Sequence, residues 1–192
     1  MSGTEDETKL LPAAIPGFPR GKHEIILADP PWNYKDKANA GKRGASHKYM
    51  TQSDNWIKNL PVEKIAADDA VLFLWVTMPF LPVGLEVMES WGFKFKTNAF
   101  TWVKTTKDGK GVKWGMGNWT RSNAELCLLG VRGKPKRVDA GVHSLVLTTP
   151  GKHSEKPKEV HDRIVKLMGP LKRVELFARR REPGWKCWGN EV

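Results

Sequence analysis

The chain has 192 residues, with 32 lysines and arginines against 21 aspartates and glutamates, and its formal net charge is +11 at neutral pH. This length suits one α/β domain with a sizeable core, and so basic a surface is typical of proteins that bind nucleic acid. Two cysteines, Cys127 and Cys187, exclude a disulfide framework and a Cys/His zinc site, and no apolar run is long enough to span a bilayer. The first residues are polar and acidic, unlike a secretory signal, so we expect an intracellular protein in the cytoplasm or on the nucleoid.

The order of apolar runs and helical patterns predicts the fold. Residues 1–20 are expected to form a flexible tail and a proline- and glycine-rich connector, followed by a single domain over 21–192. Apolar runs in that domain predict strands at 25–28, 70–76, 97–103, 125–131 and 173–178. Helical spacing predicts helices at 54–59, at 81–91 with Gly92 ending it, and at 157–168 with Pro157 at its first position. Strands separated by helices indicate an α/β fold with a doubly wound, mostly parallel sheet.

The most informative stretch is Asp29-Pro30-Pro31-Trp32, which directly follows the first apolar run. Ligands of open α/β sheets bind at the carboxyl ends of the strands. Asp29 can accept a hydrogen bond from an exocyclic amine, a proline carbonyl held by its fixed φ can be a second acceptor, and Trp32 offers a stacking face. Two acceptors stabilise the positive charge that develops when such an amine attacks an electrophile. The stretch therefore predicts a site for a planar base that carries an amine, with an ordinary turn as the alternative.

Two basic, glycine-rich segments, 33–53 and 104–121, are the candidate substrate loops. The first comes directly after the predicted base site, which favours a substrate-facing loop over a disordered insert. The nearest approach to a dinucleotide-binding glycine turn is Gly115-Met116-Gly117, which follows no predicted strand and opens no predicted helix. We therefore expect any cofactor to be held by side chains. The histidines show no ligand spacing, so we assign no metal.

Six stretches, in this order, resemble the DPPW-type adenine-N6 methyltransferases, the family of the catalytic subunit of the eukaryotic messenger-RNA adenosine methyltransferase. They are LADPPWNY (27–34), VLFLWVT (71–77), FTWVKT (100–105), ELCLLGVRGKP (125–135), HSEKPKEV (153–160) and ELFARRREPGWKCWGNE (175–191). The compact length is more similar to the prokaryotic and phage members than to the eukaryotic one, which carries extra N-terminal domains. The resemblance implies a single Rossmann-like class I methyltransferase domain over 21–192, of the permuted β-type, with the catalytic motif ahead of the cofactor-binding one.

The resemblance also implies S-adenosylmethionine as methyl donor, S-adenosylhomocysteine as product, and no metal. The cofactor-binding residues that it implies are Asp29, Lys156, Glu175, Phe177, Arg179, Asn190 and Glu191. Lys156 would pair with the methionine carboxylate, Phe177 would pack near the adenine end, and Arg179 with residues 190–191 would hold the ribose. The eukaryotic member has Gln where this chain has Glu191, and a carboxylate suits ribose hydroxyls equally well. Arg180 is interpreted as a solvated side chain.

Lys156 is also favoured by the residues alone. It precedes the predicted helix start at Pro157, where the positive end of the helix dipole attracts a carboxylate. A solvated lysine is the alternative.

The resemblance implies a catalytic set, Asp29, Pro30, Pro31 and Trp32, and a set of base-contacting residues in the two loops. The second set is Trp32, Tyr34, Tyr49, Trp119, Arg121, Asn123 and Glu125; the alternative for its loop members is an ordinary loop role. The implied reaction is methyl transfer to the N6 amine of adenine in nucleic acid, with DNA expected and RNA as the alternative.

Two further alternatives remain, and the intact Asp29 opposes both of them. Cytosine-N4 enzymes tend to carry Ser in its place, and a silent nucleic-acid-binding partner subunit would have lost the acid. We expect no membrane partner. The assembly that we consider besides a monomer is a homodimer, or a heterodimer with a related subunit.

Overall fold

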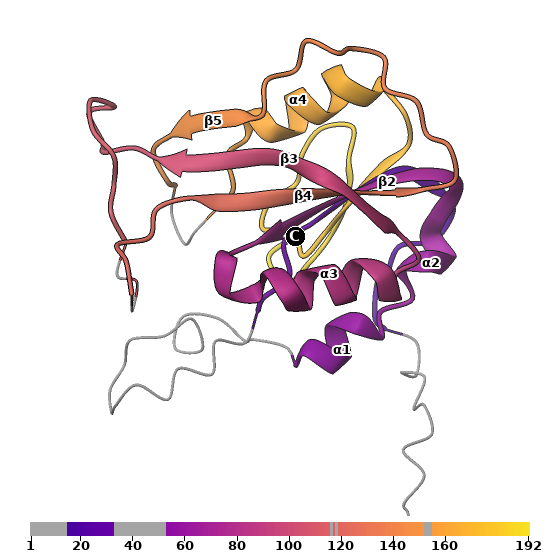
Figure 1. Cartoon of the computed structure of the whole chain (residues 1–192). Coiled ribbons are helices and arrows are strands. Elements are labelled where there is room, and N and C mark those ends of the chain that lie inside the picture. The colour runs from indigo at the N-terminus through magenta and orange to yellow at the C-terminus, as the bar shows by residue number, and fades with distance from the viewer. Residues whose placement is uncertain (1–14, 33–52, 116, 118, 152–154) are drawn as a thin grey trace, which may run out of the picture.

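The structure is a computed structural model that describes residues 15–32, 53–115, 117, 119–151 and 155–192 (Figure 1). The strands of this part are β1 (His23–Ala28), β2 (Ala66–Val76), β3 (Lys94–Lys104), β4 (Glu125–Arg132), β5 (Leu145–Thr148), β6 (Arg173–Leu176) and β7 (Lys186–Trp188). The helices are α1 (Asp54–Lys58), α2 (Val62–Ile65), α3 (Leu81–Ser90) and α4 (Glu159–Met168), with a 3-10 turn η2 at Met78–Phe80. None of these helices is long and apolar enough to cross a bilayer.

The described strands form one sheet in the order β5-β3-β4-β2-β1-β6-β7. β1 is parallel to β2 and β6, β6 to β7, and β3 to β5, whereas β4 is antiparallel to both of its neighbours. β4 is therefore the one reversed strand of the described sheet. The predicted mostly parallel sheet is confirmed. All the other strands end at one edge, and β4 begins there.

Helices cover both faces of the sheet, which explains why β1 is apolar without alternation. Ile26 and Ala28 belong to the core cluster under α1, α2 and α3, and Ile25 and Leu27 belong to the cluster under α4. Figure 1 shows α3 and α4 on opposite sides of the strands. A strand buried on both faces reads as a continuous apolar run, and each of these four β1 side chains is at most 2% exposed. The doubly wound arrangement is thus confirmed.

Several elements differ from the sequence prediction. β5 and β7, with four and three residues, are too short to give a periodic signal and were not predicted. α4 begins at Glu159 rather than at Pro157, because Pro157 and Lys158 form a preceding turn in which the Pro157 carbonyl accepts from the Val160 N–H at 3.1 Å. β6 ends at Leu176, since Phe177 has a φ of 63° and cannot continue a strand.

Residues 15–20, predicted as part of a flexible connector, pack against the last strand, β7. Phe18 packs edge-on against Trp188 with ring centroids 5.0 Å apart, and the Trp188 Nε1–H donates to the Pro16 carbonyl at 3.2 Å. Lys186 Nζ donates to the Arg20 carbonyl at 3.1 Å. This segment therefore packs with the domain, while the tail expected at 1–14 lies outside the described residues.

Candidate active site

The carboxyl edge of the sheet collects charged residues from distant parts of the chain. Asp29 directly follows β1, Lys104 ends β3, and Phe177 follows β6, whose Leu176 is in register with Ala28 of β1. Because β4 is reversed, its first residue, Glu125, lies at the same edge. Sheet topology thus brings two carboxylates and a lysine to the place where open α/β sheets bind ligands.

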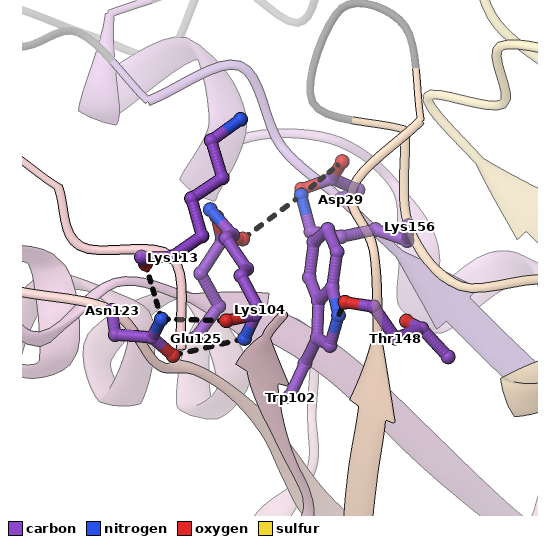
Figure 2. A network of polar contacts seen from close by, with 8 residues as sticks. All are labelled: Asp29, Trp102, Lys104, Lys113, Asn123, Glu125, Thr148 and Lys156. Carbon is purple, nitrogen blue, oxygen red and sulfur yellow. Dashed lines mark hydrogen bonds and ion pairs between the residues drawn. The ribbon is translucent and has the colours of Figure 1, made fainter. Parts of the chain in front are cut away.

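Lys156 joins these groups from the segment before α4. Its Nζ donates to both carboxylate oxygens of Asp29, at 2.8 and 2.7 Å, and lies 3.3 Å from Glu125 Oε2 (Figure 2). Lys104 forms an ion pair with the other oxygen of Glu125. The side chains of Asp29, Glu125 and Lys156 are only 16%, 11% and 14% exposed. Two carboxylates and two ammonium groups therefore form a neutral cluster at the edge, three of them largely removed from water.

The cluster shifts the pKa of three of its members. Burial raises the pKa of Asp29, and Lys156 opposes that effect only in part. Burial would lower the pKa of Lys156, but Asp29 and Glu125 outweigh it and raise that pKa. Burial would raise the pKa of Glu125, but Lys156 and Lys104 outweigh it and lower that pKa. Asp29 is therefore the one of these three groups whose charged form the surroundings disfavour.

Trp32 supports the edge from within the core. It is 5% exposed, its Nε1–H donates to the Trp75 carbonyl at 3.1 Å, and its ring stacks on Phe80 with centroids 5.7 Å apart. The Trp32 N–H also donates to the Pro30 carbonyl at 2.9 Å. In this arrangement the indole packs and anchors the turn after β1, and little of its surface is open to a base. One lone pair of the Pro30 carbonyl remains for a second donor.

The predicted base-contacting residues differ in their hydrogen bonds and in their exposure. Asn123 accepts from the Lys104 N–H at 2.9 Å and donates to the Lys104 carbonyl at 2.8 Å and to the Lys113 carbonyl. Its amide therefore stabilises the 104–113 hairpin, which is a structural loop role of the kind considered as the alternative to base contact. Trp119 is 99% exposed, and Arg121 is also exposed. Tyr34 and Tyr49 lie outside the described residues.

The C-terminal cofactor candidates converge through backbone packing. The Ala178 N–H donates to the Trp188 carbonyl at 2.9 Å. A Cβ on Gly189 would lie 2.1 Å from the Ala178 carbonyl oxygen, so only glycine fits there. This close approach sets Arg179 beside the 190–191 segment, in which both side chains are exposed. Candidates that are distant in sequence are thus neighbours at the carboxyl edge.

Three aromatic rings pack together at the turn that follows β6. Phe177 packs against Trp188 and Trp56, with ring centroids 5.5 and 6.4 Å apart. These rings form an apolar surface beside the charged residues of the edge.

Two residues have partners that the sequence did not predict. Glu175, predicted to bind the cofactor, lies one residue inside the edge, and its Oε2 pairs with His161 Nε2 of α4 at 2.9 Å. Arg180, interpreted as solvated, forms ion pairs with Glu155 and Glu182, so that interpretation is wrong. No sequence pattern marks either pairing, because the partners meet only through the fold. Lys104 was also missed; its position at the end of a strand was the one available signal.

Among the described residues, no group of three or more His, Cys, Asp or Glu side chains is placed to hold a metal ion. The carboxylates of Asp29 and Glu125 are instead balanced by lysines.

A doubly wound sheet with a buried carboxylate–lysine cluster at its carboxyl edge places this chain among the α/β proteins that bind their ligands at that edge. Comparison with known proteins agrees, since the MT-A70 family model matches residues 23–191. The chain therefore belongs to the MT-A70 family, as the sequence resemblance predicted, and it is a methyltransferase. Membership of this family implies the use of S-adenosylmethionine.

Two relatives show how the match is distributed. The chain is 36% identical over 200 residues to the type II methyltransferase M.MunI of a Mycoplasma species, covering 95% of this chain and 83% of that protein. It is 30% identical over 176 residues to the N(6)-adenosine-methyltransferase catalytic subunit METTL3 of Homo sapiens, covering 90% of this chain but 28% of that protein. The chain thus spans about a quarter of the human relative and most of the bacterial one.

Proposed function

We propose that this enzyme transfers a methyl group from S-adenosylmethionine to the N6 amine of adenine in DNA. The observation that carries the reaction is the buried Asp29 carboxylate, held by Lys156 at the end of β1. The adenine assignment is supported by the N(6)-adenosine-methyltransferases to which the chain is similar. DNA is favoured over RNA by the extent of the match to the compact bacterial methyltransferase, 83% of its length against 28% of human METTL3.

The charged residues of the edge fit S-adenosylmethionine. Its amino-acid end is a zwitterion, and the adjacent ammonium of Lys156 and carboxylate of Asp29 are complementary to such a pair of charges. Arg179 with Asn190 and Glu191 offers donors and acceptors for ribose hydroxyls. The rings around Phe177 offer an apolar surface for the adenine end. When bound, the cofactor supplies an electrophilic methyl group on a sulfonium.

Residues of this chain can then bind and orient the amine. In this structure Lys156 occupies both oxygens of Asp29, so an incoming amine needs one of them to be released. Glu125, 3.3 Å from the same ammonium, is a second carboxylate toward which Lys156 can move without becoming an unpaired buried charge. Asp29 can then accept a hydrogen bond from the amine and stabilise the positive charge that develops on the nitrogen. The methylated amine loses its proton to solvent or transiently to Asp29.

The 104–113 hairpin and the segment after it are suited to a nucleic-acid strand. Lys107, Lys110 and Lys113 are exposed there, and beyond them Trp114 and Trp119 are 67% and 99% exposed. Lysines that contact phosphates and indoles that stack on bases are the usual elements of single-strand binding. Asn123 and the Lys104–Glu125 ion pair connect this hairpin to the catalytic edge. A base unstacked by the hairpin would therefore lie near Asp29.

The decisive experiment is nucleoside mass spectrometry after incubation with S-adenosylmethionine and equal amounts of matched DNA and RNA strands. We expect N6-methyldeoxyadenosine, with unpaired adenines methylated faster than paired ones because opening a weak pair costs less. The Asp29→Ala variant gives the background. N6-methyladenosine in the RNA alone would overturn the DNA assignment, N4-methylcytosine would overturn the adenine assignment, and no product in either strand would support a silent subunit.

A further inference from the structure

We propose that Arg180 is a positioning residue that fixes the Lys156 segment against the turn that carries Arg179; this inference rests on the proposed cofactor site. Arg180 follows Arg179 directly, and its guanidinium reaches two carboxylates on different segments. Nη1 pairs with Glu155, the residue before Lys156, and Nε lies 3.4 Å from Glu182 Oε2. One side chain thus links the two segments that would hold opposite ends of the cofactor.

A second ion pair holds the same segment on its other side. Lys158 Nζ lies 3.8 Å from Glu182 Oε1. Lys156 is therefore bracketed by an ion pair one residue before it and another two residues after it, both directed to residues 180–182. Because Lys156 itself contacts Asp29, any displacement of this bracket changes the distance between the ammonium and the catalytic carboxylate.

The Arg180 part of this bracket is less exposed than the Lys158 part, whose lysine side chain is 68% exposed. Glu182 is 9% exposed, and the Arg180 side chain is 28% exposed. Arg180 Nη2 is buried and has no hydrogen-bond partner among the described residues. Exposed ion pairs contribute little to global stability, and a guanidinium held with one nitrogen unsatisfied is not an arrangement that maximises stability. Its effect is therefore expected on the geometry of the site.

The turn that Arg180 fixes has a strained backbone, which the Arg180 ion pairs help to hold in place. Phe177 has a φ of 63° and is the single non-glycine residue with a positive φ in the described part of the chain. Such a backbone conformation persists only where the surrounding structure imposes it. The hydrogen bond from Ala178 to Trp188 holds one side of this turn, and the Arg180 ion pairs hold the other.

The test measures cofactor affinity separately from nucleic-acid affinity in the full-length protein. We expect Arg180→Gln and Glu155→Gln each to raise the dissociation constant for S-adenosylhomocysteine, measured by calorimetry, by about tenfold, because Lys156 is no longer held in place. Arg180→Lys, which keeps the charge, should stay within about threefold of wild type. The KM for a DNA oligonucleotide and the melting temperature should change little in all three variants.

Glu159→Gln is the matched control. Glu159 also pairs with an arginine, Arg163, at 3.0 Å, and its side chain is 38% exposed against 36% for Glu155. We expect Glu159→Gln to leave the dissociation constant unchanged. An equal effect of both glutamate variants would show a general stability effect and overturn the proposal. A loss of affinity in Arg180→Gln with none in Glu155→Gln would also overturn it, since Arg180 would then contact the cofactor itself. Failure of the wild-type protein to bind S-adenosylhomocysteine would refute the proposed function and this inference with it.

Discussion

The two edges of the sheet carry charged side chains in opposite ways. At the carboxyl edge, Asp29, Glu125 and Lys156 are largely buried and contact one another. At the amino edge, Asp69 and Lys134 are exposed, and the Asp69 carboxylate accepts from the Lys134 backbone N–H at 2.6 Å. Polar groups of the amino edge complete turns and strand ends, whereas the carboxyl edge keeps charges out of water at a cost in desolvation. Such a cost, with perturbed pKa values, is typical of a functional site.

The largest expected effect comes from removing the buried acceptor. Asp29→Ala should lower the rate of methyl transfer by roughly a hundred- to thousandfold, the loss of about 3–4 kcal/mol expected for one preorganised hydrogen bond in a transition state. Cofactor affinity should change much less than turnover. Single-turnover assays with labelled S-adenosylmethionine measure both.

The control for Asp29 lies at the other edge. Asp69→Asn keeps an oxygen that can accept from Lys134 and should retain full activity. If Asp29→Ala kept more than about a tenth of the wild-type rate, the two edges would not differ in function as proposed.

Lys156→Met should act on the cofactor. The substituted side chain keeps most of the apolar stem of lysine but cannot form the charge-assisted bond to the carboxylate of the cofactor. That bond is worth about 1.5–3 kcal/mol, so the dissociation constant for S-adenosylhomocysteine should rise by roughly 10- to 150-fold. Calorimetry without nucleic acid gives the value. Lys134→Met at the amino edge is the matched control and should bind as wild type does. A Lys156→Met constant within twofold of wild type would move carboxylate binding to another residue.

The hairpin should account for part of the salt dependence of DNA binding. Replacing Lys107 and Lys110 with Gln should reduce the slope of log affinity against log salt by about two units if both contact phosphates. Replacing Lys134 and Lys136 with Gln at the amino edge should leave the slope unchanged. Filter binding at several salt concentrations measures both. Equal changes in the two double variants would show that DNA contacts are not confined to the catalytic side.

The smallest effect is a shift of the pH profile. Because the folded pKa of Asp29 is raised, its ionised form, and hence kcat/KM, should be lost at a higher pH than for an ordinary aspartate as the solution is acidified. Glu125 contributes to that raised pKa. Glu125→Gln should therefore move the acidic limb to lower pH, as measured by kcat/KM across the acidic range. A limb that moved to higher pH would show that Glu125 acts on the site mainly by holding Lys156.

The sequence predicted the parts of the site that are local. Asp29 directly follows a continuous apolar run, so its place at the end of a buried strand could be inferred without any tertiary information. The mostly parallel sheet followed from the alternation of strands and helices. β5 and β7 escaped prediction because three or four residues show no period.

What the sequence could not predict are contacts between distant residues. Lys156 and Asp29 are separated by 127 positions, so the resemblance identified Lys156 but not its partner. The run from Arg179 to Arg181 looks like a solvated stretch, and only the fold shows that Arg180 reaches Glu155. The resemblance likewise implied that Asn123 contacts the base, yet its amide forms hydrogen bonds with the backbone of Lys104.

The reversed strand β4 has a consequence for how target choice could evolve. Because β3 ends and β4 begins at the same edge, residues 105–124 leave the active site and return to it without crossing the sheet. The two ends of this segment are tied together by Asn123 and by the Lys104–Glu125 ion pair. Insertions within such a surface loop have a small entropic cost. If this segment contacts the nucleic acid as proposed, it can be lengthened or replaced as a unit, so that target choice changes while the residues on the sheet stay the same.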